Sequence, residues 1–230
     1  MTDASLARRL TAEGLGTALL LAVVVGSGIM GERLADGNDA IALLANTLAT
    51  GAGLVALISV FGPLSGAHFN PVVSLYFLLR REASLLQTLA YIAVQVIGAI
   101  MGVWAAHVMF DLPVLQTSHK LRDGFPLAFA DAVATFGLLL VIAGGIRYRA
   151  AVPVLVGLYI TAAYWFTAST SFANPAVTIA RSLSDTFAGI APSSAPGFIA
   201  AQFVGGLLAW LICGWLFAPA PLKNDTLSPP

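Results

Sequence analysis

The stretches FNPVVS at residues 69–74 and ANPAVT at residues 173–178 decide the fold of this chain. Each stands at the start of a short apolar segment, 70–79 and 174–184. Proline fits the first turn of a helix because it has no N–H to leave unsatisfied there, and asparagine is a good N-cap. A helix so short cannot cross the membrane core, which takes roughly 20 residues. Each segment therefore either lies on the membrane surface or dips into the bilayer and returns.

The composition is that of an integral membrane protein. Of the 230 residues, 58% are hydrophobic and 10% are charged, whereas soluble domains carry about 25% charged residues. The formal net charge is zero, which gives no case for a nucleic-acid partner. The single cysteine, Cys213, excludes a disulfide framework or a thiol-based metal site within one chain.

Six longer apolar stretches approach the length of a membrane-spanning helix. They cover residues 11–30, 41–61, 86–108, 127–146, 152–169 and 196–217. With both termini in the cytoplasm, the cytoplasmic side holds Arg8, Arg9, Arg80, Arg81, Arg147, Arg149 and Lys223, and the outer side holds Arg33, Lys120, Arg122 and Arg181. This distribution follows the positive-inside tendency. The sequence therefore predicts a multi-pass protein with both termini in the cytoplasm.

The chain contains an internal repeat, because three segments of its first half recur in the same order in its second half. They are Ala12-Glu13-x-x-x-Thr17 with Ala130-Asp131-x-x-x-Thr135, FNPVVS with ANPAVT, and Ile92-Ala93-x-Gln95-x-x-Gly98 with Ile199-Ala200-x-Gln202-x-x-Gly205. Such self-similarity indicates a duplication. We expect repeats at about 10–109 and 127–217 inside a single domain, 1–230, with a flexible tail at 218–230. Each repeat holds three spans, and since three is odd the repeats enter the membrane from opposite sides.

An inverted repeat brings the two Asn-Pro segments to the membrane centre from opposite faces. Non-helical backbone at that depth persists only where it lines a cavity or is buried in protein. The positive dipole ends of the two half-helices then face each other, which disfavours cations and protons. The side-chain amides of Asn70 and Asn174 can donate to a passing oxygen atom. The sequence thus predicts an all-α fold of six transmembrane helices and two half-helices around a passive pore for small neutral solutes.

Two acids, Glu13 and Asp131, lie inside apolar spans, where carboxylates are costly and usually functional. One reading is structural: they accept hydrogen bonds from the backbone of the dipping loops. The other is a proton relay in a coupled secondary transporter, because inverted repeats with broken helices also mark such transporters. A non-conducting junction or scaffold protein is a third class.

An enzyme is not expected. The sequence has no metal-ligand cluster, no nucleophile with a base at motif spacing and no phosphate-binding loop. We therefore expect no cofactor and no bound metal.

The chain resembles the aquaporin and aquaglyceroporin family, also called major intrinsic proteins, over about residues 10–217. The stretches AEGLGTALLL, SGAHFNPVVSL and SFANPAVTIA carry this resemblance, and SFANPAVTIARSLSDTF is similar to bacterial members associated with arsenic resistance. The resemblance implies a pore within each monomer, a homotetramer and a bacterial inner membrane. It also implies that the boxes Asn70-Pro71-Val72 and Asn174-Pro175-Ala176 meet at mid-membrane. The backbone carbonyls of Gly66, Ala67 and His68 would then line the inner half of the pore.

Two residues depart from the family pattern. Val72 replaces the alanine that usually ends the first box, and we expect its larger side chain to narrow or reshape the pore at that level. Val177 stands where the family usually places the arginine of its outer selectivity filter. Family offsets place the four filter positions at Thr50, Ala162, Ser171 and Val177, and a shift of one residue in the count would replace Ala162 by Thr161 or Ala163.

None of these four filter residues is aromatic, histidine or arginine, so the resemblance implies a wide, neutral filter. We expect it to pass some water, glycerol-like polyols, undissociated arsenic and antimony acids, and methylated arsenicals. Arg181 lies one helical turn beyond Val177. It is either an outer-mouth arginine that attracts oxyanions or donates hydrogen bonds, or an interfacial arginine paired with Asp185 or a backbone carbonyl.

Overall fold

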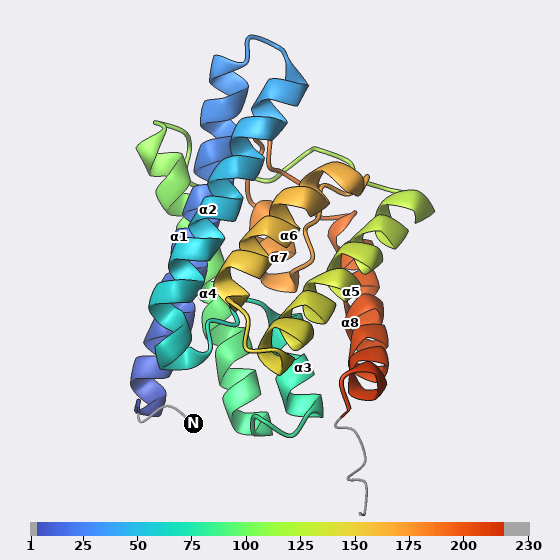
Figure 1. Ribbon diagram of the computed structural model, residues 1–230. Helices are drawn as coiled ribbons and strands as arrows, with labels where there is room; N and C mark the ends of the chain where they lie inside the picture. Colours follow the sequence, from blue (N-terminus) through green and yellow to red (C-terminus); the bar gives the residue numbers. More distant parts are fainter. Residues whose placement is uncertain (1–3, 219–230) are drawn as a thin grey trace, which may run out of the picture.

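The computed structural model describes residues 4–218, and within that range the chain is entirely helical apart from its loops (Figure 1). The helices are α1 (Leu6–Leu34), α2 (Asp39–Ser65), α3 (Pro71–Leu79), α4 (Leu85–Met109), α5 (Phe125–Arg147), α6 (Val152–Phe166), α7 (Pro175–Arg181) and α8 (Ala195–Leu216). The tail predicted at 218–230 lies outside the described residues except for its first residue.

The helices form two halves of matching design, α1–α4 and α5–α8. In the first half α1 packs mainly against α4 and α2, and in the second half α5 packs mainly against α8 and α6. Helices α2 and α6 join the halves. Figure 1 shows the half-helices α3 and α7 running toward opposite ends of the bundle. The predicted fold class, with its inverted repeat of three spans and a half-helix, is confirmed.

Glycines allow the main helices of each half to touch backbone to backbone. A Cβ atom on Gly98 of α4 would lie 2.2 Å from the carbonyl oxygen of Gly14 on α1. A Cβ atom on Gly205 of α8 would lie 2.3 Å from the carbonyl oxygen of Ala132 on α5. Small residues at such crossings are typical of helix packing in membranes. The repeat therefore preserves a close helix contact in each half.

Five of the described helices, α1, α2, α4, α5 and α8, are long and apolar enough to cross a membrane. The span predicted at 152–169 forms a shorter helix than expected, since α6 has 15 residues and ends at Phe166. The chain then leaves the helix at Thr167 because it must turn back into the bundle to reach α7. The half-helix predicted at 174–184 also ends early, at Arg181, where the backbone turns and Ser182 donates its hydroxyl to the carbonyl of Ile179.

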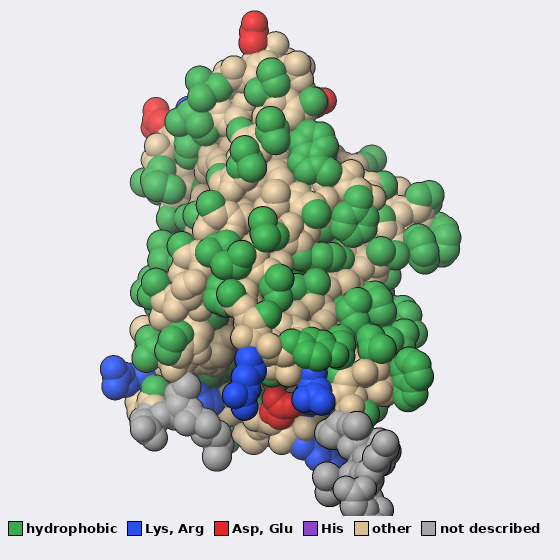
Figure 2. Space-filling view, viewed as in Figure 1, with side chains coloured by type: hydrophobic (Ala, Val, Ile, Leu, Met, Phe, Trp, Pro, Cys, Tyr) green, Lys and Arg blue, Asp and Glu red, His purple; other side chains and the backbone are tan. Residues whose placement is uncertain are grey.

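The outer surface matches a protein surrounded by lipid. Large hydrophobic side chains such as Leu86, Leu158 and Trp215 are exposed. Figure 2 shows hydrophobic side chains spread over the body of one face, with lysine and arginine gathered at the end where the chain begins. We name this end, where α1 begins and α8 ends, the terminal end. The opposite end, which holds residues 35–38 and 110–124, is the loop end.

Candidate functional site

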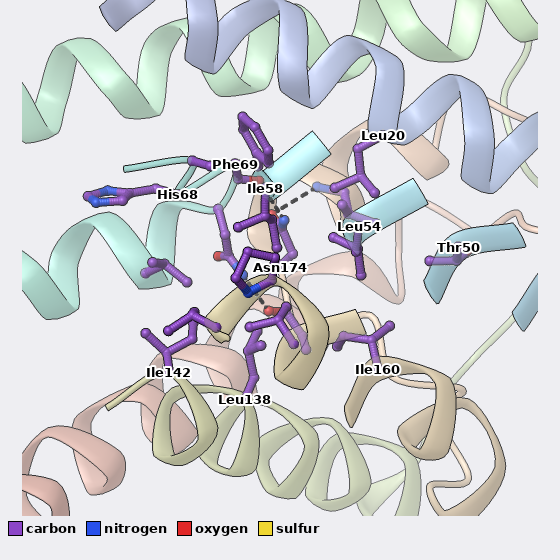
Figure 3. Close-up of a pocket in the computed structure, with 18 of the residues that line it drawn as sticks. Leu20, Thr50, Leu54, Ile58, His68, Phe69, Leu138, Ile142, Ile160 and Asn174 are labelled. Carbon is purple, nitrogen blue, oxygen red and sulfur yellow. Dashed lines mark hydrogen bonds between the residues drawn. The ribbon is translucent and has the colours of Figure 1, made fainter. Parts of the chain in front are cut away.

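A cavity of about 490 Å³ runs between the two halves. Leu20, Leu54, Leu138, Ile142 and Ile160 give it an aliphatic wall. Figure 3 shows His68 and Thr50 toward opposite ends of this cavity with Asn174 between them. Two stretches that precede the half-helices contribute polar groups to the wall, and we name them the first loop (66–70) and the second loop (167–174). Further polar side chains come from Thr50, Ser59, Tyr164 and Arg181.

The two asparagines tie the loops together at the middle of the cavity. The side-chain amide of Asn70 donates to the carbonyl of Ala173 at 2.8 Å, and that of Asn174 donates to the carbonyl of Phe69 at 2.8 Å. Each side-chain oxygen caps its own half-helix, accepting from Val72 N at 2.9 Å and from Ala176 N at 3.0 Å. An amide carries two N–H groups, so each asparagine, which lines the cavity, has a second donor for a solute.

Both loops hold unusual backbone conformations. Ala67 and Phe69 in the first loop have φ of 48°, and Ser171 and Ala173 in the second have φ of 53° and 47°. Non-glycine residues reach this left-handed region only when their surroundings impose it. The surroundings here include two buried carboxylates.

The carboxylate of Glu13 supports the first loop from outside the cavity. Its Oε1 accepts from the Ser65 hydroxyl at 2.6 Å and from His68 N at 2.9 Å. Its Oε2 accepts from Phe69 N at 2.8 Å and from the Gln95 amide at 2.9 Å. The side chain is fully buried, and Glu13 does not line the cavity in the described part of the chain.

The carboxylate of Asp131 supports the second loop in the same way. Its Oδ1 accepts from the Ser169 hydroxyl at 3.1 Å, from Phe172 N at 2.9 Å and from Ala173 N at 3.2 Å. Its Oδ2 accepts from the Gln202 amide at 2.7 Å. This arrangement corresponds to the structural reading of the two acids, because their oxygens are occupied by loop and helix donors.

The predicted inner lining lies where expected, since Gly66, Ala67 and His68 all border the cavity. The imidazole of His68 is fixed rather than free. Its Nδ1 lies 3.1 Å from the Ser74 hydroxyl, and its ring stacks on Phe77 with centroids 4.7 Å apart.

Three of the four predicted filter residues, Thr50, Ser171 and Val177, line the cavity, but Ala162 does not. Ala162 is exposed on the outside of α6. Ile160 and Tyr164, one turn apart, line the cavity instead, because a helix turns about 100° per residue and places position 162 on the far side. The Tyr164 hydroxyl lies 3.3 Å from Thr50 Oγ1. The cavity wall close to Thr50 therefore includes an aromatic side chain that the family offsets did not predict.

The assignment of Ala162 came from counting residues back from Asn174. The second loop lies between α6 and Asn174 and is irregular, so a fixed residue count does not preserve the register of α6. Because α6 is apolar on all sides, its sequence gives no amphipathic signal that marks Tyr164 as cavity-facing.

Arg181 is buried, with 2% of its surface exposed, and borders the cavity. Its Nε donates to the carbonyl of Ala188, and its guanidinium carbon lies 3.5 Å from the centroid of the Phe172 ring. Of the two partners expected for an interfacial arginine, the backbone carbonyl is found and Asp185 is not. Asp185 instead pairs with His119 Nδ1 at 3.0 Å. The cavity wall thus includes an arginine after all, one turn beyond Val177.

Residues 1–149 match the family described as "Major intrinsic protein". The chain belongs to the major intrinsic protein family. It is 56% identical over 228 residues to the aquaglyceroporin AqpS of Rhizobium meliloti (strain 1021), covering 98% of this chain and 97% of that protein. It is 28% identical over 226 residues to human aquaporin-1, covering 92% and 82%.

The fold matches the X-ray structure of the aquaglyceroporin from Plasmodium falciparum with a TM-score of 0.71. The sequence identity is 22%, and the match covers 90% of this chain and 95% of that one. As a major intrinsic protein, the chain is a multi-pass membrane channel for small neutral solutes and not an enzyme.

The valine in the first box of this major intrinsic protein does not face the pore. Val72 is buried away from the cavity, and a Cβ atom on Gly206 of α8 would lie 2.4 Å from Val72 Cγ1. The expected narrowing at this level is therefore wrong, because the extra methyl groups fill the space that Gly206 leaves. Pro71, Pro175 and Ala176 are likewise buried beside the cavity and not in its lining.

Proposed function

We propose that this major intrinsic protein is a channel with a wide outer filter, resembling the bacterial branch associated with arsenic resistance. It passes glycerol-like polyols, undissociated arsenic and antimony acids, methylated arsenicals and some water. The observation that carries the proposal is the position of Val177, whose apolar side chain borders the cavity where the family usually has an arginine. A valine there leaves more room and removes a cation from the ring.

The chemistry of the wall suits solutes with hydroxyl groups on one side. The aliphatic residues of α1, α2, α5 and α6 face the two asparagine amides and the backbone of the loops across the cavity. A polyol, or a neutral acid with several hydroxyl groups, can place its oxygens on the donors and its remaining surface on the aliphatic wall. The name of AqpS, an aquaglyceroporin, agrees with this class of solute.

Tyr164 and Arg181 refine the proposed filter. The ring formed by Thr50, Tyr164, Ser171 and Val177 contains one aromatic residue, whose hydroxyl is held close to Thr50. Arg181 lies beyond this ring, against Phe172. The width of the filter therefore depends on Val177, and its polarity depends on Ser171 and Arg181.

The alternative of a proton-coupled transporter loses support. Its relay would use Glu13 and Asp131, but both carboxylates accept hydrogen bonds from loop backbone and from a glutamine. Neither borders the cavity among the described residues, so protonating them would disrupt the loops instead of coupling to a solute.

Stopped-flow permeability of proteoliposomes tests the proposal. Water, glycerol, arsenous acid and a methylated arsenical acid are compared for the wild type, Val177→Arg and Val177→Met. The methionine variant fills space without adding charge. We expect Val177→Arg to lower glycerol and metalloid permeability at least about tenfold, an added barrier of roughly 1.4 kcal/mol, while water permeability changes less.

Other outcomes would reject parts of the proposal. A wild type that passes only water would refute the wide filter. Solute flux that needs a proton gradient would favour the transporter. An equal loss in Val177→Met would show that size alone matters at this position.

We further propose a homotetramer in a bacterial inner membrane, with both termini in the cytoplasm and the loop end outside. The exposed apolar side chains of the helices and the family membership support this arrangement. Native mass spectrometry of the detergent-purified protein and protease accessibility of a C-terminal tag in spheroplasts test the two parts separately.

A further inference from the structure

Arg181 is a buried cation without an acidic partner. Among residues 4–218 the ion pairs within 4.0 Å are Arg80–Glu82 and His119–Asp185, and neither involves Arg181. Burying an unpaired charge costs much free energy unless other groups compensate it. Ionisable residues inside a membrane protein are therefore candidates for function.

Two hydrogen-bond donors, one on Arg181 and one on Ser171, have no partner in the described structure. Nη1 of Arg181 and Oγ of Ser171 are both buried and make no hydrogen bond, and both residues border the cavity. The rest of the guanidinium is held in place by the Ala188 carbonyl and by the ring of Phe172. A fixed guanidinium with an unpartnered N–H and an unpartnered hydroxyl, both on residues that border one cavity, are suited to bind oxygen atoms, most strongly those of an anion.

Two more cations lie close to this pair. The guanidinium carbon of Arg122 is 5.1 Å from the centroid of the same Phe172 ring. Burial lowers the pKa of the Lys120 ammonium, and the charges of Arg122 and Arg181 lower it further. These two cations donate to the carbonyls of Gly189 and Phe187 and not to carboxylates.

Three acids of this region accept hydrogen bonds from groups other than these cations. Asp123 accepts from the Ser194 hydroxyl, Asp185 accepts from His119, and Asp131 holds the second loop. Among the described residues Arg181, Arg122 and Lys120 therefore form no ion pair within 4.0 Å, and the positive potential of these groups attracts small anions.

We propose that Arg181 and Ser171 form a binding subsite for a small monovalent oxyanion, the conjugate base of a weak oxyacid, at the loop end of the pore. Two oxygens of the anion bind Arg181 Nη1 and Ser171 Oγ, and a hydrogen or methyl substituent lies toward Val177. Of the three cations only Arg181 borders the cavity, so a monovalent ion matches the charge of the subsite better than a divalent one. The subsite rests on the proposed function in one respect, that the cavity is the conduction path.

Thermal unfolding of the purified channel in detergent tests binding without relying on conduction. Methanesulfonate is the probe, since it stays charged, and dimethyl sulfone is its neutral counterpart of similar size. Ionic strength is held constant with sodium chloride. Ligands that bind only the folded state raise the unfolding temperature. We expect methanesulfonate to stabilise the wild type clearly more than dimethyl sulfone does.

The variants assign the effect to the subsite. Arg181→Gln and Ser171→Ala should weaken apparent methanesulfonate binding, the former at least about tenfold, or roughly 1.4 kcal/mol. Arg181→Lys keeps the positive charge and should retain part of the methanesulfonate binding. Arg33→Gln is the matched control: Arg33 also lies over a phenylalanine, with its guanidinium carbon 5.3 Å from the Phe110 centroid, but does not border the cavity. It should respond like the wild type.

Equal stabilisation of the wild type by both probes would overturn the proposal, as would an undiminished response in Arg181→Gln. If Arg181→Gln does not fold, the wild-type contrast between probes and the Arg181→Lys variant still decide. Glycerol flux into proteoliposomes, measured with methanesulfonate on both sides of the membrane, tests whether the subsite lies in the pore. Inhibition of glycerol flux supports a subsite in the pore, and methanesulfonate binding without inhibition overturns that position. A wild type without glycerol flux would count against the proposed function, while the thermal result still decides the subsite.

Discussion

The two halves of the channel share one scaffold and differ in what they present to a solute. In each half an acid, a glutamine and a serine hold the loop. Each half also contains a stacked pair at matching positions: the residue two before the Asn of the Asn-Pro box stacks on the residue seven after that Asn. The first half has His68 on Phe77, and the second has Phe172 under Arg181.

This comparison separates two kinds of position. The groups that accept or donate to loop backbone are chemically matched between the halves, because both loops need the same hydrogen bonds. The stacked pair borders the cavity, and its chemistry changes from two aromatic rings to a cation on a ring. Duplication therefore provided a symmetric frame, while the two ends of the pore acquired different chemistry.

The largest effect is expected from removing the loop-supporting acids. Glu13→Ala leaves the backbone N–H groups of His68 and Phe69 without their acceptor, and Asp131→Ala does the same in the second loop. Each orphaned buried group costs about 1–3 kcal/mol, so both variants should lose several kcal/mol of stability, measurable as a lower unfolding temperature in detergent. Glu82→Ala, at an exposed acid, serves as the control.

If the halves are equivalent in this respect, the two acid variants should be destabilised to a similar degree. If Glu13→Ala or Asp131→Ala folds normally and loses only the solute flux that is driven by a proton gradient, the structural role is contradicted and proton-coupled transport is favoured.

The next largest loss of stability is expected at the two glycines where the main helices of each half cross. Gly98→Ala and Gly205→Ala each place a Cβ atom within 2.3 Å of a backbone carbonyl oxygen, and such overpacking costs about 1–3 kcal/mol. Gly197→Ala and Gly214→Ala on α8 meet nothing within 4 Å and should be neutral or slightly stabilising. Unfolding temperatures of the four variants measure this, and equal behaviour of all four would refute the close contact.

A smaller effect distinguishes neighbouring positions of the half-helices. Val72→Ala removes methyl groups packed against Gly206 and should cost about 2 kcal/mol without changing solute permeability. Val177→Ala should change permeability more than stability, because its side chain faces the cavity. Stopped-flow glycerol flux and unfolding temperature are measured on both. A permeability change in Val72→Ala would show that Val72 reaches the pore.

The smallest effect concerns the ion pairs that follow the half-helices. Arg80 pairs with Glu82, two residues away, whereas His119 joins Asp185 across two loops. Hydrogen bonds from the backbone and side chain of His119 lower the pKa of Asp185. An acid with a lowered folded pKa stabilises the protein above its unfolded value of about 4 and loses that contribution as the pH falls through the folded value.

Asp185→Asn should therefore lower the unfolding temperature slightly at pH 7, by less than about 1 kcal/mol of stability since the pair is exposed. The difference from the wild type should vanish as the pH falls below 4. Glu82→Gln is the matched control from the first half. A difference that persists at low pH would show that the carboxylate charge is not responsible.

The frame of the protein could be predicted from the sequence because its signals are local. Apolar length indicated the spans, Asn-Pro indicated the starts of α3 and α7, and the repeated Glu13 and Asp131 segments indicated an inverted duplication. These features depend on helix capping and on the length needed to cross a bilayer, which nearby residues decide. The proposed repeat boundaries, 10–109 and 127–217, stay predictions.

Only the tertiary structure decided which side chains meet the solute. Tyr164 replaces Ala162 in the cavity wall because an irregular loop precedes α7 and shifts the register of α6. Val72 turns toward Gly206, far away in the sequence, and Arg181 folds inward onto Phe172 instead of pairing with Asp185. A local pattern specifies where a helix begins, but the direction of each side chain depends on which distant backbone leaves room for it.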